Sequence, residues 1–231
     1  MVGCALKALR MSAGISGIVS LLVLGGPGGP GDTGTSVWLS PGRAAYAQSP
    51  GAPIRYRVVA ERSEARYLVR EQLAGLSFPN DAVGTTSAIE GSLALDVRGR
   101  VLPSDSRFSV DLRTLRSDEA RRDNYLRRNT LETDHYPNAV FVPTDVRGLP
   151  VPLPQTGTAS FDLVGDLTIR DATRRVTWEA TATIQGQDLS VQARTAFRFA
   201  DFALRVPRVS SVLSVEDTIR LEIDLLLRRS P

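Results

Sequence analysis

The chain has 231 residues, of which 42% are hydrophobic and 23% charged, and this composition suits one soluble domain with a core of ordinary size. Residues 1–47 hold three basic residues and one acidic residue, so 25 basic residues are nearly balanced by 24 acidic ones in the remainder. Nucleic-acid-binding proteins need a clustered excess of positive charge, so this balance argues against that class.

The first 47 residues have the features of a secretory signal peptide. Lys7 and Arg10 give a basic start, a short apolar stretch follows over Met11–Leu24, and Ala45–Ala47 supplies an A-x-A cleavage pattern. We therefore expect an exported protein, periplasmic or secreted, that is cleaved after Ala47. The spacer ahead of the cleavage site is unusually long, so an uncleaved anchor that tethers the protein to a membrane stays an alternative.

Cys4 is the only cysteine, and it lies within this leader. The mature chain can therefore form neither a disulfide nor a thiolate metal site. Gly26, Gly28 and Gly31 have the spacing of a dinucleotide-binding fingerprint, but that motif follows a strand and opens a helix, whereas two prolines interrupt this one. We expect a linker here, with residues 48–53 as the short connection to the next domain, and we expect no cofactor.

Residues 54–229 form one domain in which apolar and polar side chains alternate, the pattern of strands with one buried face. The alternation is clearest over Thr158–Arg170 and Arg174–Gln185, where we expect two strands joined by a tight turn. Further strands are expected around 54–58, 89–96, 107–112, 189–199 and 219–227. Strands of this kind, with short turns, must close into a barrel or pair as two sheets, and the pattern alone leaves both open.

One segment departs from this period and predicts a helix. Ser117 can cap it, Asp118 and Glu119 suit the positive end of its dipole, and it should end near Asn129. Because the surface of this helix is mostly polar, a lid over one end of a barrel suits it better than a place in the core.

Four arginines form a basic stripe on this helix: Arg121, Arg122, Arg127 and Arg128. Helical spacing lets Asp118 pair with Arg121 or Arg122, and Asp123 with Arg127, so much of the stripe is expected to be self-paired, solvated surface. The alternative is that these arginines contact an anionic head-group at the mouth of a barrel.

Signals for catalysis are weak. His135 is the only histidine, it is expected in a turn, and the chain lacks the Gly-x-Ser-x-Gly motif of serine hydrolases. The acidic pairs Asp118–Glu119 and Glu216–Asp217 lack the apolar neighbours that would separate the pKa values of an acid and a base. We predict that the protein is not an enzyme and holds no metal.

Several short motifs occur in a characteristic order: Val110-Asp111-Leu112, Arg122-Asp123, Tyr136-Pro137 with Phe141, Gly165-Asp166-Leu167-Thr168-Ile169, and Asp201-Phe202. With these residues, the region from Ile54 to Arg228 resembles the YceI-like family of lipid-binding proteins. The resemblance implies an all-β fold, an extended antiparallel, lipocalin-like β-barrel of about eight strands with one short helix capping an end. It also implies that the lumen holds a long polyisoprenoid chain.

Two positions depart from the family pattern. Many members carry a histidine at the end of an early strand, where this chain has Val69-Arg70-Glu71. Many also read Arg-x-Asp-Phe-Gly late in the barrel, and here Phe199 and Ala203 replace the arginine and the glycine. These differences concern polar recognition of a ligand's head and leave the apolar tunnel unaffected.

The function expected from these observations is sequestration of a long-chain isoprenoid or similar amphiphilic lipid in the barrel lumen, without catalysis. Small inward residues such as Ala180 and Ala193 leave room beside the large ones, although in an ordinary core the large residues would fill that room. The residues expected to contact the ligand are Phe108, Val110, Phe141, Leu163, Leu167, Trp178, Phe197, Phe199, Ile219 and Leu221. A bulkier side chain at Leu167 or Ala180 should block binding.

Two other functions remain open. One is an accessory protein of a membrane redox or stress-response pathway, with a filled barrel and a membrane-associated partner. The other is an enzyme acting on isoprenoids through His135 and a nearby carboxylate. The oligomeric state, a dimer included, is left open by the sequence.

Overall fold

The computed structural model describes residues 52–74, 77–151, 154, 156–208 and 212–230. The predicted signal peptide over 1–47 and most of the linker over 48–53 lie outside these residues and stay predictions. The strands are β1 (Ile54–Val58), β2 (Glu64–Leu73), β3 (Asn80–Thr86), β4 (Ile89–Leu95), β5 (Arg107–Asp111), β6 (Arg116–Ser117), β7 (Asn138–Arg147), β8 (Thr156–Ile169), β9 (Ala172–Gln185), β10 (Asp188–Arg198) and β11 (Val212–Ser230). The helical segments are α1 (Ala120–Tyr125), the π-helical η4 (Leu126–Thr130) and the 3-10 turns η1 (Ala60–Arg62), η2 (Pro103–Asp105), η3 (Leu112–Thr114) and η5 (Phe199–Phe202).

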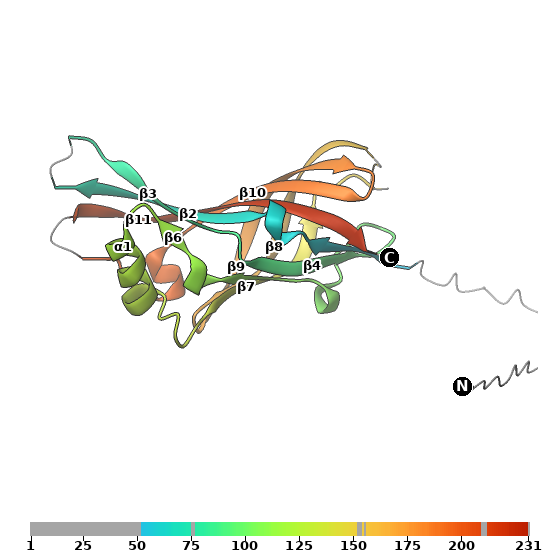
Figure 1. Cartoon of the computed structure of the whole chain (residues 1–231). Helices are drawn as coiled ribbons and strands as arrows, with labels where there is room; N and C mark the ends of the chain where they lie inside the picture. Colours follow the sequence, from blue (N-terminus) through green and yellow to red (C-terminus); the bar gives the residue numbers. More distant parts are fainter. Residues whose placement is uncertain (1–51, 75–76, 152–153, 155, 209–211, 231) are drawn as a thin grey trace, which may run out of the picture. The chain divides into compact units, whose positions relative to one another are not determined.

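These strands form one closed antiparallel barrel with eight positions in its wall (Figure 1). The ring runs β1-β4-β5-β7-β8-β9-β10-β11 and returns to β1, because β11 pairs with β1 near its end. At the other end of the barrel β11 pairs with β2 instead of β1. There β2 pairs with β3 and β3 pairs with β6, so β3 and β6 occupy the wall positions of β4 and β5. The expected eight-stranded barrel with one short helix is confirmed, and the two-sheet sandwich is excluded.

In the long strands, the apolar residues of the alternating sequence face into the barrel and the polar ones face outward. β8 and β9 pair without interruption from Thr156↔Gln185 to Ile169↔Ala172, and the expected tight turn lies at Arg170 and Asp171. Inward residues of this half of the wall, such as Leu167, Trp178 and Phe197, are buried. The outward residues between them are mostly exposed or half-buried, so the barrel has one apolar inner face.

Hydroxyl side chains satisfy backbone groups where the wall bends. Between β1 and β2, Ser63 Oγ donates to the carbonyl of Val59 at 2.8 Å and accepts from the N–H of Leu226 at 3.1 Å. Between β3 and β4, Thr86 Oγ1 accepts from the N–H of Ala88 at 3.0 Å. Because unpaired buried backbone groups are costly, these side chains allow the strands to break without losing the closed ring.

The helix begins later than the sequence predicts. Ser117 does not cap it, because the backbone of Ser117 belongs to β6 and pairs with Gly84 of β3. The N-cap is Glu119, whose side chain accepts from the N–H of Arg121 at 3.0 Å. Ser117 Oγ donates instead to Asp123 Oδ1 at 2.7 Å, which ties the helix to the end of β6.

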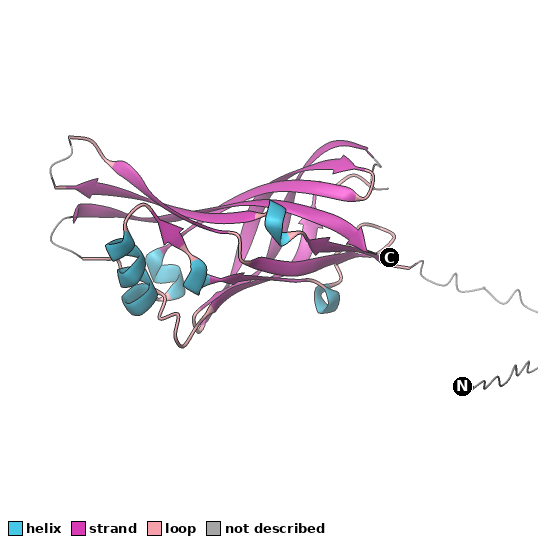
Figure 2. Ribbon diagram, viewed as in Figure 1, coloured by secondary structure: helices cyan, strands magenta, loops and turns pink. Residues whose placement is uncertain are grey.

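We call the segment 120–130, made of α1 and η4, the lid. It ends one residue beyond the predicted end and lies at one end of the barrel, beside the first residues of β11 and next to β6 (Figures 1 and 2). No helix within the described ranges is both long and apolar enough to cross a bilayer.

Three aromatic rings lie against glycines of the neighbouring strand. A methyl group built on Gly84 would come within 2.2 Å of the ring of Tyr67, which is its register partner on β2. Phe108 is the register partner of Gly91 and places both its backbone and its ring close to it, and the ring of Phe141 lies over Gly165. Since each ring occupies the space that a side chain opposite would fill, it lies along the wall and leaves the middle of the lumen free.

Tyr67 is also a titratable group of the wall whose pKa is shifted by its surroundings. Its hydroxyl lies close to Ser117 but forms no hydrogen bond of ordinary geometry within the described chain. Burial raises the pKa of Tyr67 to about 12, and the guanidinium of Arg122 opposes this only in part.

The contact between Tyr67 and Gly84 predicts that substitutions at these two positions have non-additive effects on the free energy of unfolding. Gly84→Ala should lower the free energy of unfolding by about 1 to 3 kcal/mol, because the added methyl group overpacks the wall. In a Tyr67→Leu background the same substitution should cost less than about 1 kcal/mol, because the ring is gone. Urea unfolding of the four chains measures this cycle, and equal costs in both backgrounds would show that the ring is not the obstacle.

The raised pKa of Tyr67 predicts a loss of stability in alkali. Below pH 10 the tyrosine is neutral in both states; from pH 10 towards 12 the unfolded chain ionises first, so stability falls as pH rises. Tyr67→Phe should lessen this fall, and at pH 7 it should leave stability unchanged or raise it by about 1 kcal/mol, since a buried unpaired hydroxyl is costly. Urea unfolding at pH 8 and pH 11 provides the test, and an identical fall in both proteins contradicts it.

Candidate functional site

An apolar cavity of about 200 Å³ lies inside the barrel, and almost all of the atoms that form its wall are apolar. Along β11 the wall extends from Ile219 to Leu227, which is about 26 Å of strand at about 3.3 Å per residue. The cavity is therefore long and narrow. Eight-stranded barrels have an interior that side chains can just fill or that can hold one slim ligand, and the second arrangement is found here.

All ten residues predicted to contact a ligand line this cavity. They come from β5, β7, β8, β9, β10 and β11 and from η5, so the wall surrounds the space on most sides. Their position is an observation, whereas their contact with a ligand stays a prediction.

The sequence missed the part of the wall that β2 and the lid contribute. Val69 on β2, Leu126 and Leu131 around the lid, and Leu204 after η5 also line the cavity. The alternation along β2 could have revealed Val69, but an acidic residue on the same inward face, Glu71, interrupts it. Leu126 and Leu131 gave no periodic signal, because the lid is too short for one.

Ala180 is buried in the core of the barrel, as expected, and pairs with Ala193 across β9 and β10. Ala193 itself lines the luminal cavity. Ala193 is therefore a further position, besides Leu167, at which a larger side chain would enter the free space, and the expectation for Ala180 stays a prediction.

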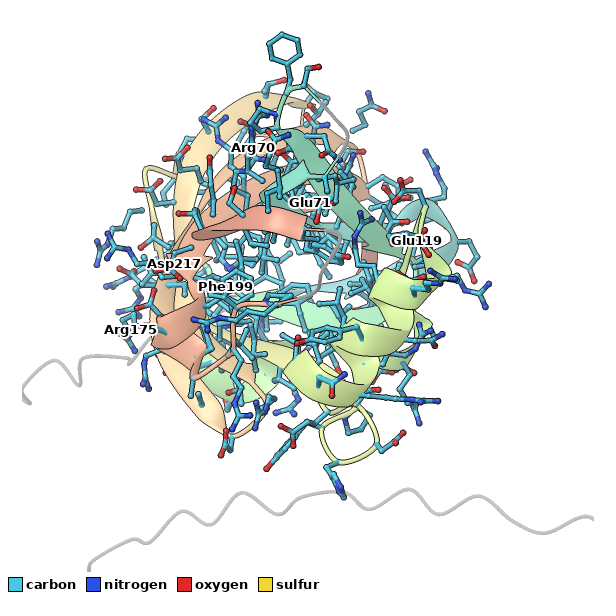
Figure 3. The ribbon with its side chains drawn as sticks, turned by 90° about the vertical axis from the view of Figure 1, so that its left-hand side faces the viewer. Arg70, Glu71, Glu119, Arg175, Phe199 and Asp217 are labelled. Carbon is cyan, nitrogen blue, oxygen red and sulfur yellow. The ribbon has the colours of Figure 1, made fainter. Side chains whose placement is uncertain are left out.

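The lid closes one end of the cavity with apolar side chains. Leu115, Leu126 and Leu131 reach the cavity wall from the lid and its flanks. Figure 3 looks onto this end, with Glu119, the N-cap of the lid, on one side of the opening, Arg175 and Asp217 on the opposite side, and Glu71 and Phe199 between them. The lid thus presents leucines to the lumen at one side of this opening.

A buried ion pair fastens the lid to β2. Arg122 Nη2 lies 2.6 Å from Glu71 Oε1, and the two side chains are only 17% and 8% exposed. The other guanidinium nitrogen, Nη1, lies 2.6 Å from the exposed carboxylate of Asp118. Removing one partner of such a pair leaves an uncompensated buried charge, so the contact holds the lid against the inner face of β2.

A second set of contacts holds the other side of the lid to the turn between β8 and β9. Arg170 Nη2 lies 2.8 Å from Glu132 Oε1, Nη1 donates to the carbonyl of Thr130 at 3.4 Å, and the guanidinium lies 5.6 Å from the ring centroid of Tyr136. The lid is therefore attached to β2 at one side and to the β8–β9 turn at the other.

The arginine stripe is only partly the solvated surface that the sequence predicts. Arg122 pairs with Asp118 as expected, but it is mostly buried. The expected pair between Asp123 and Arg127 is not formed: Asp123 accepts from Ser117, and Arg127 donates to the carbonyl of Leu115 and to Asn124. Arg122 is thus committed to holding the lid and is not available to a ligand's head.

His135 does not belong to the residues that line the cavity. It is exposed in the turn before β7. Among the described residues, no group of three or more histidine, aspartate, glutamate or cysteine side chains is placed to hold a metal ion.

Comparison with known sequences gives the following matches. The model of the YceI-like domain matches residues 56–227. A UPF0312 protein of Pseudomonas putida is 29% identical over 182 residues, which cover 75% of this chain and 88% of that protein. A UPF0312 protein of Pseudomonas fluorescens is 30% identical over 151 residues, which cover 62% of this chain and 71% of that protein.

Solved structures share the fold at low identity. A polyisoprenoid binding domain from Saccharophagus degradans, implicated in plant cell wall breakdown, superposes with a TM-score of 0.61 at 13% identity, over 76% of this chain and 98% of that one. The YCEI protein of Campylobacter jejuni superposes with a TM-score of 0.52 at 15% identity, over 69% and 91%. Because the family model spans the barrel from β1 to Leu227 of β11, well over half of the chain, this protein belongs to the YceI-like domain family.

Proposed function

We propose that this protein is an exported, non-catalytic carrier that holds the hydrocarbon tail of a long-chain isoprenoid or similar lipid in its lumen. The observation that carries the proposal is the long, narrow cavity with an apolar wall beneath the lid. The signal-peptide pattern of residues 1–47 supports export. The binding of polyisoprenoids by the Saccharophagus degradans domain, which has the same fold, supports the class of ligand.

The energetics favour a tail without polar groups. Burying one CH₂ group contributes about 0.8 kcal/mol, so a tail of ten carbons gains on the order of 8 kcal/mol before the cost of immobilisation. A polar atom within the cavity would lose its hydration and find almost no partner on this wall, which is unfavourable. The ligand's head therefore stays outside the apolar part of the lumen.

Native mass spectrometry of protein purified from its own source tests this function directly. A lipid that co-purifies, with a mass that matches a prenyl chain after extraction, supports the proposal. A barrel that is empty in every preparation, and that takes up no prenyl lipid from detergent, contradicts it.

A pair of variants on β10 tests whether the lumen is the binding site. Ala193→Phe places a ring in the cavity and should lower the amount of bound lipid at least tenfold, whereas Ala196→Phe adds the same ring to the outer face and should leave it unchanged. Overpacking is expected to cost about 1 to 3 kcal/mol, so circular dichroism must confirm that both variants are folded. Equal lipid loads in the two variants would exclude the lumen as the site.

The ion pair between Glu71 and Arg122 predicts control of ligand release. Arg122→Leu should lower the free energy of unfolding by about 3 to 5 kcal/mol, and Glu71→Leu with Arg122→Leu should restore much of it, because no buried charge is then left alone. In both variants a bound lipid should dissociate faster, since the lid is no longer tied to β2.

Energy transfer from Trp178 to a dansyl-labelled prenyl lipid measures this release rate. Trp178 lines the cavity, and the full chain with Trp38→Phe has it as its only tryptophan. Exposed Arg194→Leu, whose partner Glu179 lies on the outer face of β9, serves as the control and should leave the rate unchanged. An unchanged rate in the double variant would show that the lid does not control release.

A further inference from the structure

Three strands extend past the lid at one end of the barrel. β11 pairs with β10 only from Thr218 onward, whereas its earlier part continues alongside β2, with Val212 opposite Leu73. β3 pairs with β2 on its other side, so β2 lies between β3 and β11 (Figure 1, left). We call the end of this extension the tip: residues 77–79 ahead of β3, residues 205–208, and residues 212–215 of β11.

The tip carries unusually exposed apolar side chains. Phe78 is 79% exposed and Leu213 is 68% exposed, and Val206, at 36%, borders the same surface hollow as Leu213. Five large apolar side chains are exposed among the described residues; these three lie at the tip and the other two, Val97 and Val151, lie in loops at the opposite end. Grouped exposed apolar residues of this kind mark a surface that meets a protein or a lipid phase.

The charge around these residues favours an anionic partner. Residues 72–80 contain no charged residue, and residues 202–215 contain Arg205 and Arg208 but no acidic residue. Both arginines are exposed. The exposed acidic residues Glu216 and Asp217 follow the tip on β11, so the side formed by residues 205–208, with apolar side chains beside two arginines, is the one that matches the boundary of a bilayer with negatively charged head-groups.

The tip lies only a few residues along the chain from the wall of the cavity. Leu204 is buried and lines the cavity wall, and Val206, two residues further along, is exposed at the tip. On the neighbouring strand, Val69 lines the same cavity, and β2 runs from there to the tip. A hydrocarbon tail that leaves a bilayer at the tip would therefore have only a short distance to the lumen, past the ion pair of Glu71 and Arg122.

We propose that the tip docks onto the surface of an anionic lipid bilayer, with Phe78 and Leu213 inserted among the head-groups, so that tails pass between bilayer and lumen. The passage of tails rests on the proposed function, whereas the docking itself does not. A second copy of the chain is a poorer occupant, because Pro79 just before β3, Asp81 on β3, and Glu216 and Asp217 on β11 oppose the addition of a further strand.

A site-specific label on the full chain tests the docking. In a Cys4→Ser background, Ser77→Cys next to Phe78 and Arg98→Cys next to Val97 each accept one environment-sensitive fluorophore at opposite ends of the barrel. Vesicles of phosphatidylcholine and phosphatidylglycerol (3:1) carrying a lipid-attached quencher should quench the first label and not the second. The leader is the same in both proteins, so any binding through it is common to both.

Two sets of variants test the contacts. Phe78→Ser with Leu213→Ser should weaken docking at least tenfold, and Arg205→Gln with Arg208→Gln should weaken it about fivefold for each arginine at low salt. Docking should also weaken in 1 M NaCl and on vesicles of phosphatidylcholine alone. Quenching of both labels, quenching of neither, or a dimer in sedimentation that Phe78→Ser dissociates would overturn the proposal.

The lipid load of the same preparations separates this inference from the proposed function. If the label at Ser77→Cys is not quenched but lipid still co-purifies, the docking proposal fails alone. If the label is quenched but the lumen takes up no lipid, the carrier function fails alone. Where both hold, the Phe78 and Leu213 variant should slow lipid transfer from vesicles about tenfold and keep its lipid load in detergent.

Discussion

The pairing of β1 with the end of β11 is the constraint on which the rest of this structure depends. Each of the eight wall positions has one apolar face, and a sheet left open between Val58 and Leu227 would expose all of them to water. Closure turns these faces inward and creates an interior whose width depends on the number of strands. The ring can close although the strands break, because Ser63 and Thr86 satisfy the backbone groups at two of the breaks.

Closure alone would give a solid core, and the contacts between rings and glycines explain why a cavity remains. Tyr67, Phe108 and Phe141 are large enough to fill the lumen, but each lies against a glycine of an adjacent strand. The rings therefore add apolar surface to the wall without crossing the central space. The same arrangement leaves the Tyr67 hydroxyl buried near the lid without a normal partner, which is a cost of keeping a large aromatic side chain in this part of the wall.

The sequence predicted the parts of the structure that a period of two controls. The inward residues of β8 to β11 lie in long strands with regular register, so alternation alone identified Leu167, Trp178 and Phe197 as inward. The resemblance to a family then decided between barrel and sandwich, which the alternation could not do. The prediction that Ser117 caps the helix was wrong, because serine can also be the last residue of a strand. Its pairing with Gly84 joins residues that are far apart in the sequence, so the local pattern could not reveal it.

The lid contacts could not be predicted for the same reason. Glu71 and Arg122 are 51 residues apart, and each resembles an ordinary surface charge in the sequence. The inward face of β2 lies next to the lid only in the folded protein. There Glu71, an acidic residue among apolar ones, gains Arg122 as its partner. An inward charge at the end of an otherwise apolar strand is therefore better interpreted as one half of an unseen ion pair than as an exception to the pattern.

Polar and charged side chains thus lie at the two ends of the barrel, while the lumen between them is apolar. This separation limits the kinds of ligand that the protein can bind. The wall offers a ligand almost no hydrogen-bonding atoms, and the lid's buried arginine is already paired. Selection among lipids must then come from tail length and width and from the ends of the barrel. After Lys7 every basic residue is arginine, a side chain that suits contacts with phosphate groups. Binding of an anionic surface at the tip should consequently depend on salt.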